Sequence, residues 1–207
     1  MLNRIKTSAL FATSNTITKV YIEDFEYPWE IITRIEEIIS KIGATLDKSE
    51  YYSARPGVWI SRQAKIAESA YIGAPSIVMT GAEIRHSAYI RRGALICPGA
   101  VVGNSTEVKN AILMEGAAAP HFNYVGDSIL GCKAHIGAGV ICSNLRLDKS
   151  EVLIHVGEKT VHTGAKKLGA IIGDFAEIGS GSVLNPGTVI LPNARVYPLS
   201  SVRGVAK

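Results

Sequence analysis

The sequence predicts an all-β solenoid, a parallel β-helix whose unit is a repeat of six residues. From residue 58 the chain divides into groups of six whose third residue is apolar and almost always β-branched: Ile60, Ile66, Ile72, Val78, Ile84, Ile90, Ile96, Val102, Val108, and later Ile172, Ile178, Leu184, Ile190, Val196 and Val202. After Val58, the first residue of each group is small: Ala64, Ala70, Ser76, Ala82, Ala88, Ala94, Ala100, Thr106, and later Ala170, Ala176, Ser182, Thr188, Ala194 and Ser200. A period of six fits neither a 3.6-residue helix nor a simple alternating strand, but it is typical of short strands joined by tight corners.

The two repeating positions lie two residues apart, so both side chains point to the same side of a strand. We expect the branched residue to fill the interior and the small residue to occupy a crowded corner. An ordinary β-sandwich is the alternative for alternating strands, but its strands would vary in length and its turns would not recur every six residues. The repeats therefore favour the parallel β-helix.

Composition places the chain among folded proteins and excludes several classes. The 207 residues are 47% hydrophobic and 19% charged, with a formal net charge of +4, which is too apolar for a disordered chain. The lack of a dense basic run and the small aromatic share argue against a nucleic-acid partner. No apolar stretch approaches the ~20 residues of a membrane-spanning helix, and the N-terminus lacks the apolar centre of a signal peptide. We expect a cytoplasmic protein with no nucleic-acid or membrane partner.

Residues 1–56 precede the repeats and are expected to form an N-terminal segment with one helix, at about 27–43, and a linker. Pro28 suits the first helical position, and Gly43 is expected to end the helix. The isoleucines between them recur at helical spacing and form one apolar stripe: Ile31, Ile32, Ile35, Ile38, Ile39 and Ile42. Such a stripe either packs against the β-helix or forms a contact with another copy of the chain.

The β-helix is expected over residues 57–205, with two interruptions. The stretch ILMEGAAAPHFN breaks the period, which resumes at Tyr124, so a loop is expected at about 114–123. A longer polar stretch predicts a second loop at about 145–168. Insertions in a repeat protein form loops that often lie on the binding side.

His121 lies in the first interruption and is the residue that points to chemistry. An imidazole titrates near neutral pH and can serve as a general base when it is exposed beside a substrate. A lone loop histidine is more often a surface residue, so its role depends on what surrounds it. The cysteines match no zinc-binding spacing and are expected to be reduced thiols, with Cys142 in an inward position: Cys97, Cys132 and Cys142.

The block EVKNAILMEGAAAPHFNYVGDSILGCKAHIGAGVICSN, residues 107–144, carries a specific resemblance. It resembles the acetyltransferase domain of the bacterial bifunctional N-acetylglucosamine-1-phosphate uridyltransferase/glucosamine-1-phosphate acetyltransferases. HFNYVGDSILG, NLRLD and KKLGAIIGD are similar to the related sugar-1-phosphate nucleotidylyltransferase/acetyltransferases, and EYPWE resembles a Pro-Trp motif that precedes their β-helix. The resemblance covers residues 57–205 and implies a left-handed β-helix that assembles as a homotrimer.

The resemblance also implies roles for individual residues. His121 matches the catalytic base, and the sugar-phosphate site is matched by Arg91, Lys109, Tyr124, Asn144 and, from an adjacent chain, Lys167 or its neighbour Lys166. Positions that contact acetyl-coenzyme A are matched by Ala138, Ser180 and Pro198. Two positions depart from the family, because the bifunctional enzyme has a sugar-contacting Asn at the place of His135 and an Ala at the place of Pro198.

The implied reaction is acetylation of the amine of an amino-sugar phosphate or nucleotide sugar, a step of nucleotide-sugar biosynthesis, with acetyl-coenzyme A as the co-substrate. His121 would take the proton of the attacking amine, and coenzyme A would lie in a groove between two prisms of the trimer. No metal is implied. The chain shows neither the Gly-rich phosphate loop nor the α/β pattern of a nucleotidyltransferase domain. We therefore expect it to lack that activity on its own.

Two other functions remain open from the sequence. The β-helix could be a non-catalytic regulatory or scaffold subunit that partners a separate nucleotidyltransferase. It could also be a zinc enzyme of the γ-carbonic anhydrase type, which uses the same fold and binds zinc through three histidines across an interface. Two histidines five residues apart would mark that class, and the histidines of this chain show no such spacing: His86, His121, His135, His155 and His162.

Overall fold

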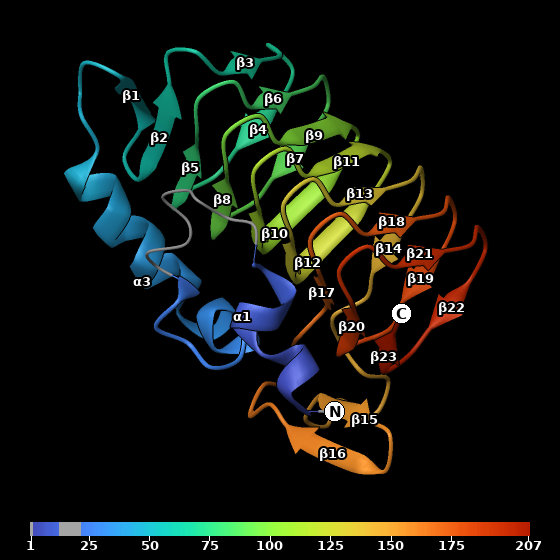
Figure 1. Ribbon diagram of the computed structural model, residues 1–207. Helices are drawn as coiled ribbons and strands as arrows, with labels where there is room; N and C mark the ends of the chain where they lie inside the picture. Colours follow the sequence, from blue (N-terminus) through green and yellow to red (C-terminus); the bar gives the residue numbers. More distant parts are fainter. Residues whose placement is uncertain (1, 13–21) are drawn as a thin grey trace.

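The computed structural model describes residues 2–12 and 22–207 and confirms the parallel β-helix that the repeats predict (Figure 1). Each coil contributes one short strand to each of three faces of a prism, and successive coils pair through parallel backbone hydrogen bonds. The repeat residues fill the interior as predicted, and Ile90, Ile96 and Ala100 are fully buried there. The three faces differ in the side chains that they carry outward.

The charged face carries mostly ionisable side chains. Its strands are β3 (Lys65–Ile66), β6 (Glu83–Ile84), β9 (Val101–Asn104), β11 (Ala118–His121), β13 (His135–Ile136), β18 (Glu177–Ile178) and β21 (Arg195–Val196). Its outward column, one residue per coil, is Lys65, Glu83, Val101, Ala118, His135, Glu177 and Arg195.

The tyrosine face carries three phenols in its outward column. Its strands are β4 (Tyr71–Ile72), β7 (Tyr89–Ile90), the first halves of β10 (Glu107–Leu113) and β12 (Tyr124–Leu130), then β14 (Ile141–Cys142), β19 (Val183–Leu184) and β22 (Ser201–Val202). The column reads Tyr71, Tyr89, Glu107, Tyr124, Ile141, Val183 and Ser201.

The covered face is apolar on its outside as well as its inside. It comprises β2 (Val58–Ser61), β5 (Ser76–Val78), β8 (Ala94–Ile96), the second halves of β10 and β12, β17 (Ala170–Ile172), β20 (Thr188–Ile190) and β23 (Val205–Ala206), with β1 (Tyr51–Arg55) antiparallel beside β2. Its outward column is Trp59, Ile77, Leu95, Ile112, Ile129, Ile171, Val189 and Val205. Such a face needs a cover to remove it from water.

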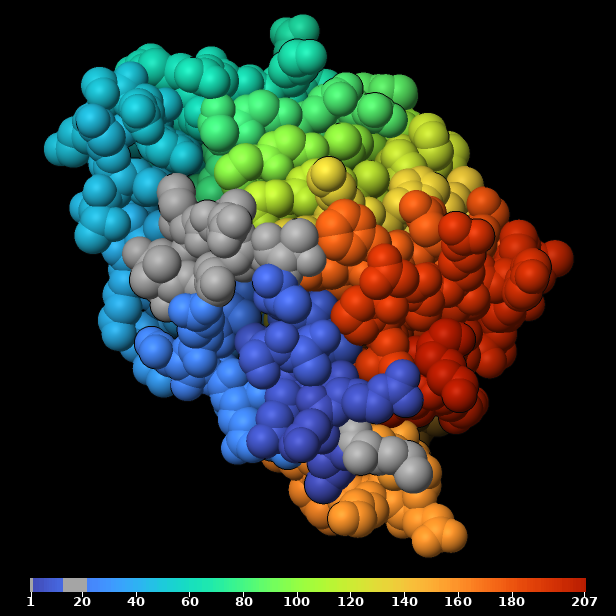
Figure 2. Space-filling view, in the orientation of Figure 1, coloured from blue at the N-terminus to red at the C-terminus, as the bar shows by residue number. Residues whose placement is uncertain are grey.

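Helix α3 (Trp29–Thr45) supplies that cover by lying across β5, β8, β10 and β12, with every isoleucine of the stripe buried except Ile38, which is half-buried. The short helices η1 (Leu2–Ile5) and α1 (Thr7–Leu10) extend the cover toward the C-terminal coils, as the blue segment of Figure 2 shows. The helix does not end at Gly43 as predicted. The missing side chain of Gly43 lets the helix approach the ring of Trp59, and two more residues continue it. No helix within the described residues is long and apolar enough to cross a membrane.

The first interruption proves to be a strand, not the loop expected at 114–123. Ala118–His121 form β11, which pairs with β9 and β13. The repeat is hidden there because Ala119 occupies an interior position that other coils fill with a branched side chain. The register also differs from the prediction, because Val125 enters the core whereas Tyr124 points outward.

The change of phase lies upstream, at the corner formed by Lys109–Asn110. On the tyrosine face Tyr89 pairs with Glu107, eighteen positions later, but on the covered face Ala94 pairs with Ala111, only seventeen positions later. One residue is therefore missing between the two faces. The corner is tighter there than in the preceding coils, and the next coil repeats the shortening, because Ala111 pairs with Ser128, again seventeen positions later.

The second interruption leaves the prism at this same corner and is more than a loop. Leu145 and Lys167 form an antiparallel bridge at its base, and it carries the hairpin of β15 (Leu153–Val156) and β16 (Lys159–His162). Apolar side chains of the insertion, Ile154 among them, join the apolar cluster between the covered face and the N-terminal helices. Figure 1 shows the hairpin in orange beyond the last coils.

Candidate functional site

A buried polar cluster occupies the corner between the tyrosine face and the covered face, which we call the lysine corner. Lys109 Nζ lies 3.0 Å from both carboxylate oxygens of Asp127, and the two side chains are 11% and 4% exposed. Asn110 Nδ2 donates a hydrogen bond to Asp127 Oδ1 at 3.1 Å, and Asn144 Nδ2 donates to Asp127 Oδ2. Asp127 thus accepts from side chains of both the preceding and the following coil.

The backbone at Gly126 allows the cluster to close over Tyr124. A Cβ at position 126 would lie 2.6 Å from Tyr124 Oη and 2.8 Å from Asn144 Nδ2. Asn144 Nδ2 donates to Tyr124 Oη over 3.2 Å. Burial, with the Asp127 charge nearby, raises the pKa of the Tyr124 phenol. The phenol therefore stays protonated at neutral pH and can donate its hydrogen to a ligand on the tyrosine face.

Arg91 lies at the rim of the same corner, one coil before Lys109. Its Nη1 is 3.1 Å from Glu107 Oε1, and the two side chains are 44% and 35% exposed. The Glu107 carboxylate raises the pKa of Arg91. An exposed pair of this kind is weak, so an anionic ligand can replace Glu107 on the guanidinium. The ammonium of Lys109 has three donors, of which Asp127 takes two.

His121 ends strand β11 at the opposite edge of the tyrosine face, which we call the histidine corner. Its side chain is exposed and makes no hydrogen bond or ion pair with any described residue. The remaining histidines each have a side-chain partner: Asn104 for His86, Glu177 for His135, Thr160 for His155 and Glu151 for His162. The backbone of His121 is fixed by hydrogen bonds to Asn123 Oδ1 and from Gly139 N, both 3.0 Å. A free imidazole on a fixed backbone is available as a base.

Three predicted coenzyme positions continue the histidine corner below His121. The residue that follows Ala138 donates its N–H to the His121 carbonyl at 3.0 Å. In the same way, the residue after Ser180 donates to the Ala138 carbonyl at 2.8 Å, and the residue after Pro198 donates to the Ser180 carbonyl at 2.9 Å. All four side chains are exposed. The backbone N–H of Ala138 has no hydrogen-bond acceptor among the residues that the structure describes. The column therefore presents a continuous edge, and the free N–H of Ala138 precedes the residue that donates to the His121 carbonyl.

His135 lies around this corner, on the charged face, and not with the lysine-corner cluster. Its Nδ1 is 3.0 Å from Glu177 Oε2. Both line a depression of about 430 Å³ that also reaches Ser180, Tyr197 and Pro198. In one chain, then, His135 is grouped with the coenzyme positions and is separated from Tyr124 and Asn144.

The predicted lysine of the adjacent chain, Lys167, lies exposed at the base of the insertion, as does Lys166. Neither makes a hydrogen bond to the lysine-corner cluster within its own chain, as far as the described residues go. A cavity of about 500 Å³ lies nearby, between the insertion and the last coil. Its ionisable lining residues are Arg146, Asp148, His155 and Arg203.

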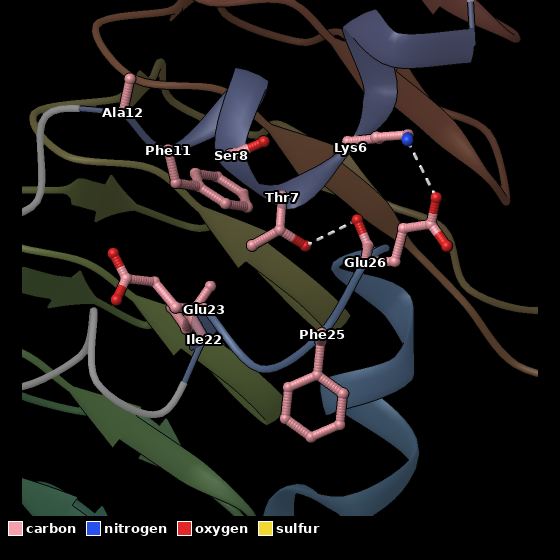
Figure 3. A pocket seen from close by; sticks show the side chains of 9 residues that line it. All are labelled: Lys6, Thr7, Ser8, Phe11, Ala12, Ile22, Glu23, Phe25 and Glu26. Atoms are coloured by element: carbon pink, nitrogen blue, oxygen red, sulfur yellow. Dashed lines mark hydrogen bonds and ion pairs between the residues drawn. The ribbon is translucent and has the colours of Figure 1, made fainter.

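A further cavity, of about 360 Å³, lies in the N-terminal segment and is shown in Figure 3. Lys6 and Glu26 form an ion pair of 3.0 Å across it, and Thr7 Oγ1 donates to the Glu26 carbonyl at 3.2 Å. No predicted site residue lines it. The cavity is therefore separate from the arrangement around His121.

Sequence reasoning missed Asp127, Asn110 and Glu107, which connect the predicted residues at the lysine corner. A signal for Asp127 was present, because it is the one charged residue of the strand YVGDSIL. A charge placed among apolar residues of a strand needs a buried partner. The shortened corner that brings Lys109 to it could not be read from the hexapeptide pattern.

Comparison with known proteins identifies related chains. A family model described as "GMPPB C-terminal domain" matches residues 74–198. A bifunctional sugar-1-phosphate nucleotidylyltransferase/acetyltransferase of Sulfurisphaera tokodaii is 42% identical over 92 residues, which cover 44% of this chain and 23% of that protein. The bifunctional protein GlmU of Methanococcus maripaludis is 33% identical over 182 residues, 86% of this chain and 44% of that protein. This chain therefore spans less than half the length of either relative.

Among solved structures, a hexapeptide transferase family protein from Anaplasma phagocytophilum superimposes with a TM-score of 0.52. The match covers 67% of this chain and 72% of that chain at 17% sequence identity. At this identity the likeness concerns the fold, and it agrees with the hexapeptide β-helix described above.

Proposed function

This chain belongs to the GMPPB C-terminal domain family, and we propose that it is an acetyl-coenzyme A-dependent N-acetyltransferase that acts on an amino-sugar phosphate or nucleotide sugar. The printed name of one relative couples sugar-1-phosphate nucleotidyl transfer to acetyl transfer, and the match covers 23% of that relative. One observation carries the proposal. The free imidazole of His121 lies across the tyrosine face from the cations Arg91 and Lys109.

The acceptor is proposed to lie on the tyrosine face between the two corners. Its phosphate would contact Arg91, released from Glu107, and the third N–H of Lys109. A planar guanidinium can hold two phosphate oxygens, and an ammonium adds a point charge. Tyr124 and Asn144 would hydrogen-bond the sugar between the phosphate and His121.

Base catalysis is assigned to His121. The neutral imidazole would accept a proton of the attacking amine while the nitrogen adds to the thioester carbonyl. The Ala138 N–H would donate to the oxyanion that forms on that carbonyl. Collapse of the adduct expels the thiolate of coenzyme A, which takes up the proton that His121 holds. No covalent enzyme intermediate is required.

Coenzyme A is proposed to follow the histidine corner past Ser180 and Pro198 into the depression beside His135. That depression opens on the charged face, whereas the acceptor lies on the tyrosine face. We propose that a homotrimer sets the tyrosine face of one copy near the charged face of the next. Such an arrangement would bring the partner's insertion, with Lys166 and Lys167, toward the acceptor.

The experiment is release of free coenzyme A from acetyl-coenzyme A, with glucosamine 1-phosphate and galactosamine 1-phosphate as acceptors. His121→Ala is expected to lower kcat by about 100- to 10,000-fold, the usual contribution of a general base, with an unchanged circular-dichroism spectrum. His162→Ala is the matched control, because this exposed histidine lies on the hairpin and pairs with Glu151.

The outcomes separate the proposal from its alternatives. Equal turnover by wild type and His121→Ala would contradict the assignment of the base. A wild-type protein that neither turns over nor gains thermal stability with acetyl-coenzyme A would favour the non-catalytic scaffold. A ligand present at 100 times its Kd adds about 2.7 kcal/mol to stability, so the second measurement is sensitive.

A further inference from the structure

The N-terminal end of the tyrosine face carries two aromatic rings that the proposed chemistry does not use. Tyr71 and Tyr89 are 47% and 46% exposed. Their ring centroids lie 5.5 Å apart with planes tilted by 57°. Arg55 Cζ lies 5.0 Å from the centroid of the Tyr71 ring. We call these three residues the tyrosine strip.

A half-exposed aromatic pair with a cation over one ring leaves two kinds of surface for a ligand. The free ring faces favour a planar aromatic group, which stacks without needing a particular hydrogen-bond pattern. The guanidinium favours an anion or a second π-system. A nucleobase joined to phosphates combines both features.

The tyrosine strip is continuous with the proposed acceptor site. Tyr89 pairs with Glu107 on the next coil, and Glu107 pairs with Tyr124 on the coil after that. Each step between parallel strands is about 4.8 Å. Arg91 follows Tyr89 by two residues and reaches Glu107, so it lies between the strip and the sugar position. The tyrosine strip therefore begins beside Arg91, at the N-terminal end of the proposed phosphate position.

The direction of the acceptor follows from the order of the coils. The coenzyme positions Ala138, Ser180 and Pro198 all lie on the C-terminal side of His121, whereas Arg91 lies on its N-terminal side. The amine must face the coenzyme, so the phosphate faces the N-terminal coils. Any group attached to that phosphate would extend toward Tyr89 and Tyr71.

From these contacts we propose that the tyrosine strip is a nucleoside subsite, and that the acceptor is a nucleoside-diphosphate amino sugar. This inference rests on the proposed function and names its substrate class. A sugar 1-phosphate ends at Arg91 and leaves both rings bare. A nucleoside diphosphate sugar places its first phosphate at Arg91 and Lys109, its second toward Arg55, and its base on Tyr89 or Tyr71.

The test measures binding of nucleoside diphosphates without any sugar, by titration calorimetry. The probes are UDP, GDP, CDP and dTDP, with inorganic pyrophosphate as the reference that has charge but no base. At least one nucleoside diphosphate is expected to bind about 5- to 160-fold more tightly than pyrophosphate, which is the stacking contribution of one base converted to affinity. Tyr71→Ala/Tyr89→Ala is expected to remove that preference, whereas Tyr71→Phe/Tyr89→Phe keeps it.

Two controls isolate the strip. Tyr52→Ala removes a tyrosine that is 38% exposed on β1, outside the strip, and is expected to leave the preference unchanged. His121→Ala is expected to bind nucleoside diphosphates as the wild type does, because the proposed position of the nucleoside diphosphate lies away from the His121 imidazole. The mass of each variant is measured by light scattering in the same samples.

The outcomes distinguish failure of this inference from failure of the proposed function. Equal affinity of the wild type for pyrophosphate and for all four nucleoside diphosphates overturns the subsite, even where glucosamine 1-phosphate is acetylated. Tyrosine variants that dissociate into monomers and keep the preference show that the strip joins copies of the chain, and this result also overturns it. Nucleoside binding that depends on the tyrosines, without turnover of any amino sugar, supports the subsite and removes the proposed function.

Discussion

Asp127 is the residue on which the lysine corner depends. It lies within 3.0 Å of Lys109 Nζ through both oxygens and accepts from Asn110 and Asn144 as well. A buried ion pair need not add net stability, because both charges lose their hydration. Removal of one partner, in contrast, leaves the other charge buried and unpaired. The pair therefore fixes the position of the ammonium and the Asn144 amide more than it stabilises the fold.

We predict that Asp127→Asn and Lys109→Met each destabilise the protein by about 3–5 kcal/mol. The double variant is expected to lose less than the sum of the two, with a coupling of about 0.5–3 kcal/mol. Wild type, the two single variants and the double variant form a double-mutant cycle. Urea denaturation at one fixed protein concentration measures the stability of all four. Strictly additive losses would show that the ammonium and the carboxylate do not stabilise each other.

Cys142 leads to a prediction about pH. The thiol is fully buried, and burial raises its pKa to about 12, against about 8.5 in an unfolded chain. The native state therefore holds this proton more tightly than the unfolded state. The stability it contributes is complete below about pH 8.5 and is lost as pH rises from there toward 12, by up to about 1.4 kcal/mol per pH unit.

Urea midpoints at pH 7, 8, 9 and 10 test this expectation. The stability of the wild type is expected to fall above pH 8.5. Cys142→Ala is expected to be less stable at pH 7, and its stability is expected to fall less steeply with pH. The pKa of Cys132 is also raised to about 12 by burial, so a residual slope remains in that variant. Parallel pH profiles of the two proteins would contradict the assignment to Cys142.

At the scale of elements, the groups of six residues predicted the strands well, because the first and third side chains of each group can be buried only in the interior of the closed prism. Ile96, Ala100 and Val102 are fully buried, as the repeat requires. The same groups contain a second signal, a large apolar residue every third group, which now explains the covered face: Trp59, Ile77, Leu95, Ile112, Ile129, Ile171 and Val189. Read together with the isoleucine stripe at 31–42, that signal would have predicted where the helix packs.

The site was less predictable than the fold for a physical reason. Stacking of the coils aligns residues at equivalent positions of the repeat. The column from His121 to Pro198 therefore follows from the repeat spacing once the register is known. The lysine corner depends instead on one residue missing between Val108 and Ala111, and on Asp127 pairing across coils. A deletion of this kind leaves each hexapeptide locally normal, so only the three-dimensional pairing reveals it.

Gly43 shows how closely helix α3 approaches the covered face. A Cβ there would lie 2.5 Å from three ring carbons of Trp59. We predict that Gly43→Ala lowers the free energy of unfolding by about 1–3 kcal/mol through overpacking, although alanine is favoured over glycine in a helix by about 1 kcal/mol. Ser40→Ala, on the exposed side of the same helix, is the control and is expected to change little. A gain in stability for Gly43→Ala would mean that the ring of Trp59 moves aside freely.

For the whole molecule, the helical cover decides which surfaces remain for assembly. Helix α3 and the N-terminal segment occupy the covered face, so copies of the chain can meet through the charged face and the tyrosine face. The proposed acceptor and coenzyme positions are divided between these same two faces. Contact between them in a closed ring would complete three equivalent sites, because each heterologous contact repeats around the symmetry axis.

We therefore predict a trimer of about 66 kDa, three times the chain mass of 22.1 kDa, and a loss of both assembly and turnover in Val101→Arg. Val101 lies half-buried in the outward column of the charged face, where an added guanidinium leaves the prism core untouched but would enter a contact between copies. Light scattering and coenzyme A release are measured on the same samples, with Ser40→Arg on the solvent side of α3 as the control. A wild-type monomer that still transfers the acetyl group would separate catalysis from assembly, and the site would then have to be complete within one chain, with His135 and Lys167 outside it.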